Sequence, residues 1–118
     1  MSAPVVIVDS NRDGLEMYVT ALALEGIEAA AATSAPEALD VIAKTHPRAV
    51  VTELRLPGAR GTELIKRMRT MQPHAYIVGL SASGAREARE ATDAGCDLVL
   101  SLPCLPDTLV KHLQHALS

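Results

Sequence analysis

The sequence has almost no large aromatic side chains, since its 118 residues include no Trp, no Phe and only two tyrosines, Tyr18 and Tyr76. This absence removes the rings on which proteins stack the bases of single-stranded nucleic acids. The 48% of residues that are hydrophobic must therefore build a core chiefly from Ala, Val, Leu and Ile. Such a core suits helices packed against a sheet.

An excess of positive charge is also missing. The formal net charge is −3, and the lysines and arginines are spread along the chain. Proteins that bind nucleic acids in general depend on clustered Lys and Arg to neutralise phosphates. We therefore expect no nucleic-acid partner.

Long hydrophobic runs are absent as well. No apolar stretch approaches the ~20 residues that a membrane-spanning helix needs. Residues 1–4 show no charged region followed by a hydrophobic one. The sequence therefore predicts neither a membrane span nor a signal peptide, and we expect a cytoplasmic protein without a membrane partner.

Residues suited to metal sites or disulfides are few. The two cysteines, Cys96 and Cys104, are expected to be reduced thiols in a chain that looks intracellular. His112 and His115 lie three residues apart on the last predicted helix, a spacing that can bind metal. Without a third ligand they are expected to be surface residues, so no metal site is predicted.

Five short apolar runs alternate with five stretches of helical periodicity. The runs cover residues 4–9, 27–32, 48–53, 75–80 and 97–102. Ser10 is the expected N-cap of the first helix, and Ser34 with Glu37 forms a capping box for the second. The alternation predicts βαβ units and a parallel sheet with right-handed crossovers. We expect one domain over residues 1–118, either standing alone or cut from a longer protein.

Polar residues stand at the carboxyl ends of three predicted strands. Asp9 and Ser10 follow the first strand, Glu53 ends the third and Ser81 follows the fourth. Parallel α/β sheets gather such residues at one edge, where their ligands bind. Two carboxylates meeting there should repel, which would raise the pKa of the pair unless Arg12 or Arg55 folds over it.

These motifs, in this order, resemble the receiver domain of bacterial two-component response regulators over essentially the whole chain. The matching segments are Val-Ile-Val-Asp9-Ser10, Glu53-Leu-Arg-Leu-Pro57-Gly58, Gly79-Leu80-Ser81-Ala82 and Gly95-Cys-Asp97 running into Leu102-Pro103. The resemblance implies a flavodoxin-like (βα)5 fold, a doubly wound parallel sheet of strand order 2-1-3-4-5 in three α/β/α layers.

The sequence departs from the family at the residues that carry its chemistry. The family uses an aspartate nucleophile, an acidic metal cluster, a lysine and a switch aromatic, and Glu53, Ser10, Leu102 and Val99 stand at those positions. We therefore expect no enzymatic activity, no phosphorylation of Glu53 and no required cofactor. Weak Mg²⁺ binding by Asp9 and Glu53 stays open, since magnesium relies on carboxylates.

The resemblance then implies a degenerate receiver, or pseudo-receiver, that binds another protein independently of phosphorylation. Its partner would be a protein, an output domain or a second copy of the chain. The expected contact face spans residues 85–117, with Arg86, Arg89, Val99, Ser101, Leu105 and Lys111.

Two other functions stay open at this point. The chain could be a working phosphoacceptor with an unusual acidic site, or a small-ligand sensor using the pocket that metal and lysine would have vacated beside Leu102. Glu53 itself has two interpretations: a stand-in for a phosphorylated aspartate, or a solvated carboxylate in a decayed site.

Overall fold

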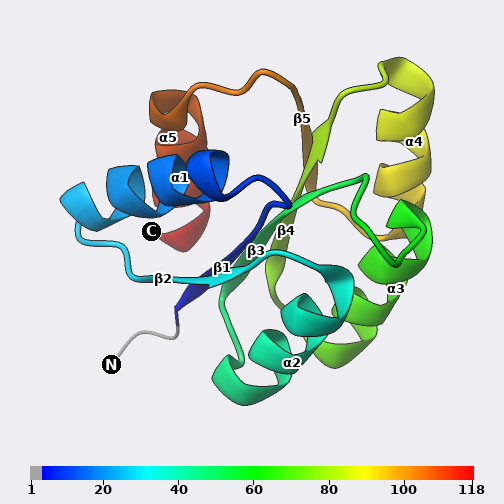
Figure 1. Cartoon of the computed structure of the whole chain (residues 1–118), viewed down its shortest axis with the longest axis horizontal. Helices are drawn as coiled ribbons and strands as arrows, with labels where there is room; N and C mark the ends of the chain where they lie inside the picture. Colours follow the sequence, from blue (N-terminus) through cyan, green and yellow to red (C-terminus); the bar gives the residue numbers. More distant parts are fainter. Residues whose placement is uncertain (1–3) are drawn as a thin grey trace.

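The computed structural model describes residues 4–118 and contains one five-stranded parallel sheet (Figure 1). The strands run in the order β2-β1-β3-β4-β5, which confirms the predicted doubly wound topology. Their bounds are β1 Val5–Val8, β2 Ala29–Ala32, β3 Ala49–Glu53, β4 Tyr76–Ser81 and β5 Leu98–Ser101.

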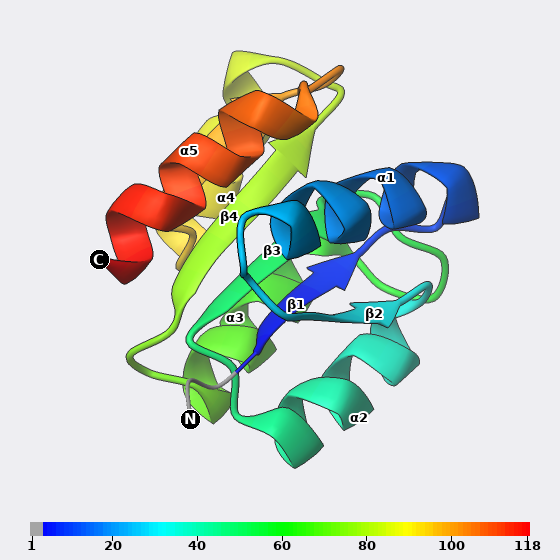
Figure 2. The same ribbon diagram turned by 90° about the vertical axis from the view of Figure 1, so that its left-hand side faces the viewer.

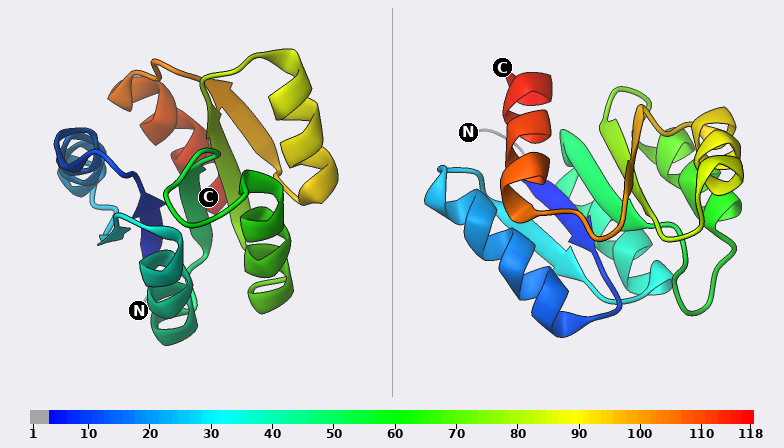
Figure 3. Two further views of the ribbon diagram at one scale, coloured as in Figure 1. Left: turned by 45° about the vertical axis from the view of Figure 1, so that its right-hand side comes forward. Right: turned by 90° about the horizontal axis from the view of Figure 1, so that it is seen from above.

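Five helices cover the two faces of this sheet. They are α1 Arg12–Leu24, α2 Ala35–Thr45, α3 Gly61–Met71, α4 Ala85–Ala94 and α5 Pro106–Leu117. Helices α1 and α5 pack on one face, and α2, α3 and α4 pack on the other (Figures 2 and 3). The predicted three-layer arrangement is therefore confirmed.

Alternation along the strands divides the core into two clusters. Val5 and Ile7 of β1 face the cluster under α1 and α5, whereas Val6 and Val8 face the cluster under α2, α3 and α4. All four side chains are buried, because successive residues of a strand point to opposite faces and helices cover both faces here. Both tyrosines belong to the side under α1 and α5, where Tyr18 is a member of the cluster and Tyr76 packs against it. Tyr18 is buried and donates its hydroxyl to the Cys104 carbonyl at 2.7 Å.

Side-chain N-caps mark the start of two helices, α1 and α2. Ser34 caps α2 as predicted, accepting the Glu37 N–H at 3.3 Å. The prediction for α1 was wrong: its N-cap is Asn11, whose side-chain oxygen accepts the N–H groups of Asp13 and Gly14. Asn and Ser are about equally good N-caps, and Ser10 is drawn away by another contact described below.

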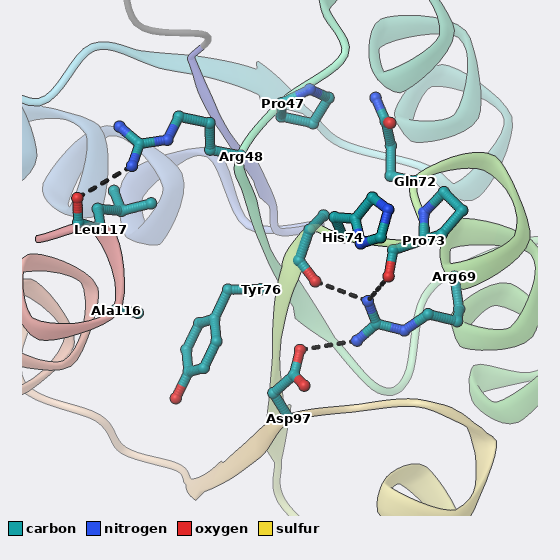
Figure 4. A pocket seen from close by; sticks show the side chains of 11 residues that line it. Pro47, Arg48, Arg69, Gln72, Pro73, His74, Tyr76, Asp97, Ala116 and Leu117 are labelled. Atoms are coloured by element: carbon teal, nitrogen blue, oxygen red, sulfur yellow. Dashed lines mark hydrogen bonds and ion pairs between the residues drawn. The ribbon is translucent and has the colours of Figure 1, made fainter.

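A hollow of about 560 Å³ lies at the amino end of β3 and β4, and two arginines that line it bind backbone carbonyls of other segments (Figure 4). Arg69 donates to the carbonyls of Gly95, Pro73 and Ala75, and also to the Asp97 carboxylate at 2.7 Å. Arg48 donates to the carbonyl of Leu117 at 3.0 Å. Both guanidinium groups are thus used to join loops and helix ends.

Among residues 4–118, no helix combines the length and the hydrophobicity needed to cross a bilayer. Both cysteines are buried and free. Burial is the main reason that the pKa of Cys96 is raised to about 12. Cys96 and Cys104 both belong to the hydrophobic core, which agrees with the predicted thiols.

Gly61 should be required for packing where α3 begins. A Cβ atom at this position would collide with the backbone carbonyl of Leu54, which cannot rotate aside. We expect Gly61→Ala to lower the free energy of unfolding by about 2–3 kcal/mol, as for other overpacked positions. Gly26→Ala is the matched control, because a Cβ there meets no atom within 4 Å and only its positive φ of 75° is unfavourable. That control should lose about 1 kcal/mol. Equal losses in urea unfolding would contradict this account.

Candidate functional site

The carboxyl edge of the sheet brings the predicted polar residues together. Asp9 follows β1, while Glu53 and Ser81 are the last residues of β3 and β4. The register pairs Val8 with Thr52 and Glu53 with Leu80. Three neighbouring strands therefore end within two residues of one another, with Glu53 on the central one.

The Glu53 carboxylate is directed toward the β1–α1 connection. Its Oε1 accepts the Ser10 backbone N–H at 2.9 Å, and the Ser10 hydroxyl lies 3.3 Å from the same oxygen. This contact explains why Ser10 does not cap α1. Asp9 is buried at 7% exposure, and its Oδ1 accepts the Asn11 N–H at 2.8 Å.

The environment of Glu53 favours its neutral form. Burial first, and then the neighbouring Asp9 carboxylate, raise the pKa of Glu53 to about 7, although the Ser10 hydrogen bonds oppose this shift. The raised pKa was predicted from charge repulsion alone, whereas burial is the larger cause. Arg55 does not fold over this pair, because its guanidinium binds Glu87.

Ser81 is held on the other side of the edge by a residue that the sequence analysis missed. Its hydroxyl donates to Glu87 Oε1 at 2.6 Å, and Arg55 Nε donates to Glu87 Oε2 at 3.1 Å. Burial would raise the pKa of Glu87, but the hydrogen bonds from Ser81 and Arg55 outweigh it and hold the pKa below its ordinary value. The available signal was an acidic residue in the first turn of a helix, where the dipole favours it.

Leu102 and Val99 are packing residues in this structure. Both are half-buried. Leu102 packs against the cluster under α1 and α5, and its N–H donates to the Ser81 carbonyl at 2.8 Å. Val99 packs against the opposite cluster, under α2, α3 and α4. Neither residue therefore brings a charged side chain to the edge of the sheet.

The family profile described as "Response regulator receiver domain" matches residues 5–114. The chain belongs to the response regulator receiver family. It is similar to a response regulator receiver protein of Anaeromyxobacter sp. (strain Fw109-5), with 37% identity over 86 residues, which cover 73% of this chain and 36% of that protein. It is also similar to the response regulator MprA of Mycobacterium bovis (strain BCG / Pasteur 1173P2), with 30% identity over 115 residues, 97% of this chain and 50% of that one.

Solved receiver structures agree with this assignment. A CheY-like receiver domain protein from Methanospirillum hungatei JF-1 superposes with a TM-score of 0.92 at 23% identity, covering 99% of this chain and 94% of that one. The chemotaxis response regulator CheY4 of Vibrio cholerae gives 0.88 at 26% identity, covering 98% and 99%. The chain spans half or less of the length of the two curated relatives named above.

The residues present do not fit the resident magnesium ion of the receiver family. The donors at the edge are Asp9, Glu53 and the neutral hydroxyl of Ser10, and Mg²⁺ relies on carboxylates because it loses water reluctantly. Within residues 4–118, no group of three His, Cys, Asp or Glu side chains could hold a metal ion.

The residues predicted for the partner face of this receiver are mainly at the surface. Arg86, Arg89, Ser101, Leu105 and Lys111 are exposed, whereas Val99 is half-buried. Leu105 is the most accessible apolar member, at 69% exposure. Arg86 forms an ion pair with Glu90 at 3.1 Å, one turn along α4. This ion pair lies on the solvent-exposed face of the helix.

Glu53 should make receiver stability depend on pH in a known direction. The pKa of Glu53 is about 7 in the folded chain against an ordinary value of 4.5. The stability that protonation of Glu53 adds is fully present below the pKa of this group in the unfolded chain. It is lost as the pH rises through its pKa in the folded chain. Glu53→Gln should therefore gain stability relative to wild type between pH 5 and pH 8, by about 1 kcal/mol, because Glu53 is only half-buried and solvent screens part of the effect.

Urea unfolding at both pH values measures this difference. Glu16→Gln, at an exposed position of α1, is the control and should show no such pH-dependent gain. An equal effect of Glu53→Gln at pH 5 and pH 8 would rule out the raised pKa.

Proposed function

We propose that this chain is a receiver domain that is not phosphorylated by the usual route and that acts by binding another protein. Under this proposal it is a cytoplasmic signalling module without enzymatic activity. The observation that carries the proposal is the direction of the Glu53 carboxylate, which is bonded to Ser10 at 2.9 Å.

Glu53 is a poor candidate for the phosphoryl-accepting nucleophile. Its side chain is one methylene longer than the aspartate used by the family, and a misplacement of ~1 Å can cost on the order of a hundredfold in rate. Its pKa of about 7 also leaves much of the carboxyl protonated at neutral pH. A protonated carboxyl is not a nucleophile.

The rest of the edge supports the same conclusion. Leu102 cannot supply the positive charge that would engage a phosphoryl group, since only a cationic donor does this well. With donors limited to Asp9, Glu53 and a hydroxyl, we expect only weak Mg²⁺ binding. These three features together would remove the nucleophile, the cation and the metal from the usual reaction.

The partner proposal uses the exposed residues of α4, β5 and α5. Arg89, Lys111 and the apolar Leu105 are exposed there, so the face combines cationic groups with an apolar contact. We propose that it receives a protein partner, an output domain of a longer protein or a second copy of this chain. A domain that lacks its usual switch would be regulated through abundance or partner competition.

Incubation with acetyl phosphate and Mg²⁺, followed by intact-mass spectrometry, tests the central point. We expect no added phosphoryl group on the wild-type chain. A variant carrying Ser10→Asp, Glu53→Asp and Leu102→Lys restores the residue types of the family and should gain a magnesium-dependent phosphoryl group. A phosphoryl group found on Glu53 of the wild-type chain would overturn the proposal.

An NMR titration with Mg²⁺ and then beryllofluoride provides the independent measurement. The amide signals of Asp9, Ser10, Glu53 and Ser81 should stay unchanged when the analogue is added. Saturable shifts that extend to Lys111 on α5 would instead identify a working phosphoacceptor switch.

A further inference from the structure

The Glu87 carboxylate joins three segments that are far apart in the sequence. It accepts from Ser81 at the end of β4 and from Arg55 in the β3–α3 connection, at 2.6 and 3.1 Å. The Ser83 backbone N–H donates to the Ser81 hydroxyl oxygen at 3.3 Å. Glu87 itself lies in the first turn of α4. One side chain therefore connects the polar edge of the sheet with a helix of the partner face.

Few other contacts hold this end of α4. The buried residues of the helix are Ala91 and Ala94, which lie in its second half. Its N-cap residue is Gly84, which makes no side-chain capping bond. A carboxylate in the first turn is favourable beside the helix dipole. The amino end of α4 thus depends mainly on Glu87 for its attachment to the sheet.

The Glu87 interaction differs from an ordinary surface ion pair. The Glu87 side chain is 20% exposed, whereas Arg86 and Glu90 on the same helix are 92% and 53% exposed. Pairs as exposed as the latter contribute little to stability. Hydrogen bonds to a partly buried charged group are stronger, so Glu87 and Glu90 form a matched comparison.

Glu87 also determines what Ser81 can bind. The Ser81 hydroxyl has one proton to donate, and it donates this proton to Glu87 Oε1. Glu53 receives its hydrogen bonds from Ser10. The two polar clusters of the edge are therefore built separately, and the Ser81 cluster is the one connected to α4.

We infer that Glu87 is an internal acidic ligand that fixes Ser81 and the amino end of α4 in one position, so that the chain's own carboxylate sets the geometry of the partner face. This inference rests on the proposed function, because a face held by an internal group needs no added phosphoryl group. Glu87 is a positioning residue in this account, and Arg55 keeps its carboxylate charged and oriented.

Amide hydrogen exchange measured by NMR, without Mg²⁺ or phosphodonor, tests the inference. Glu87→Ala should speed exchange of the amides of residues 88–91 by about tenfold, because this end of α4 then opens more often. Alanine is the best helix former, so faster exchange would not reflect a poorer helix propensity. Core amides such as Val51 and Val78 should exchange as in wild type, which separates local opening from global destabilisation.

Two further variants make the measurement specific. Glu90→Ala removes the exposed carboxylate one turn away and should leave the exchange of residues 88–91 within twofold of wild type. Ser81→Ala should perturb the same amides as Glu87→Ala, and the double variant should match Glu87→Ala alone, because both substitutions break one shared contact.

Equal exchange rates in Glu87→Ala and Glu90→Ala would overturn the inference, as would strictly additive effects of Ser81→Ala and Glu87→Ala. Its failure is distinct from failure of the proposed function. Phosphorylation of the wild-type chain would overturn the proposed function and leave the exchange result unchanged. Conversely, unchanged exchange of residues 88–91 in Glu87→Ala would show that the Glu87 contact does not fix the amino end of α4. The proposed function would still stand if Glu53 stays unphosphorylated.

Discussion

The parallel pairing of β1, β3 and β4 is the constraint on which the site depends. Pairing Thr52 with both Val8 and Gly79 brings the three strands to an end within two residues of one another. Helices bury both faces of these strands, so a register shift of one residue would turn every core side chain toward the wrong layer. The same register that fills two cores therefore also determines which polar residues become neighbours at the edge.

The neighbours at this edge form two electrostatic groups with opposite effects. Asp9 and Glu53 bring two acidic groups together in a partly buried place, which raises the pKa of Glu53 to about 7. Glu87 meets the cationic Arg55 and the Ser81 hydroxyl, which hold its pKa below the ordinary value. One carboxyl is thereby shifted toward its neutral form, and the other is kept ionised.

Membership of the receiver family and these departures are compatible. The fold is set by apolar periodicity, helix caps and strand pairing, and the side chains of Glu53 and Ser10 are not part of either hydrophobic cluster. Those residues lie at strand ends and in connections, where a scaffold tolerates substitution. A fold shared with other receivers at TM-scores of 0.88 to 0.92 therefore does not transfer their chemistry.

Local pattern was sufficient for much of the fold. All five predicted strands form with helices between them, and Ser34 caps α2 as expected, because periodicity and capping act over three or four residues. The strand ends moved by one or two residues, as element boundaries commonly do. The predicted N-cap of α1 was wrong because Ser10 and Asn11 are both good N-caps, and Ser10 is engaged in a hydrogen bond with the distant Glu53.

Residue types and their spacing predict the order and type of the elements and the carboxyl ends of the strands. They also show that the family's lysine and second acidic residue are absent. They do not predict the direction of each charged side chain, since it depends on partners brought together by folding. The sequence left open whether Arg55 covers Asp9 and Glu53, and in the structure Arg55 binds Glu87, 32 residues along the chain. The tertiary structure decides this, because a long cationic side chain goes to the carboxylate that packing places within reach.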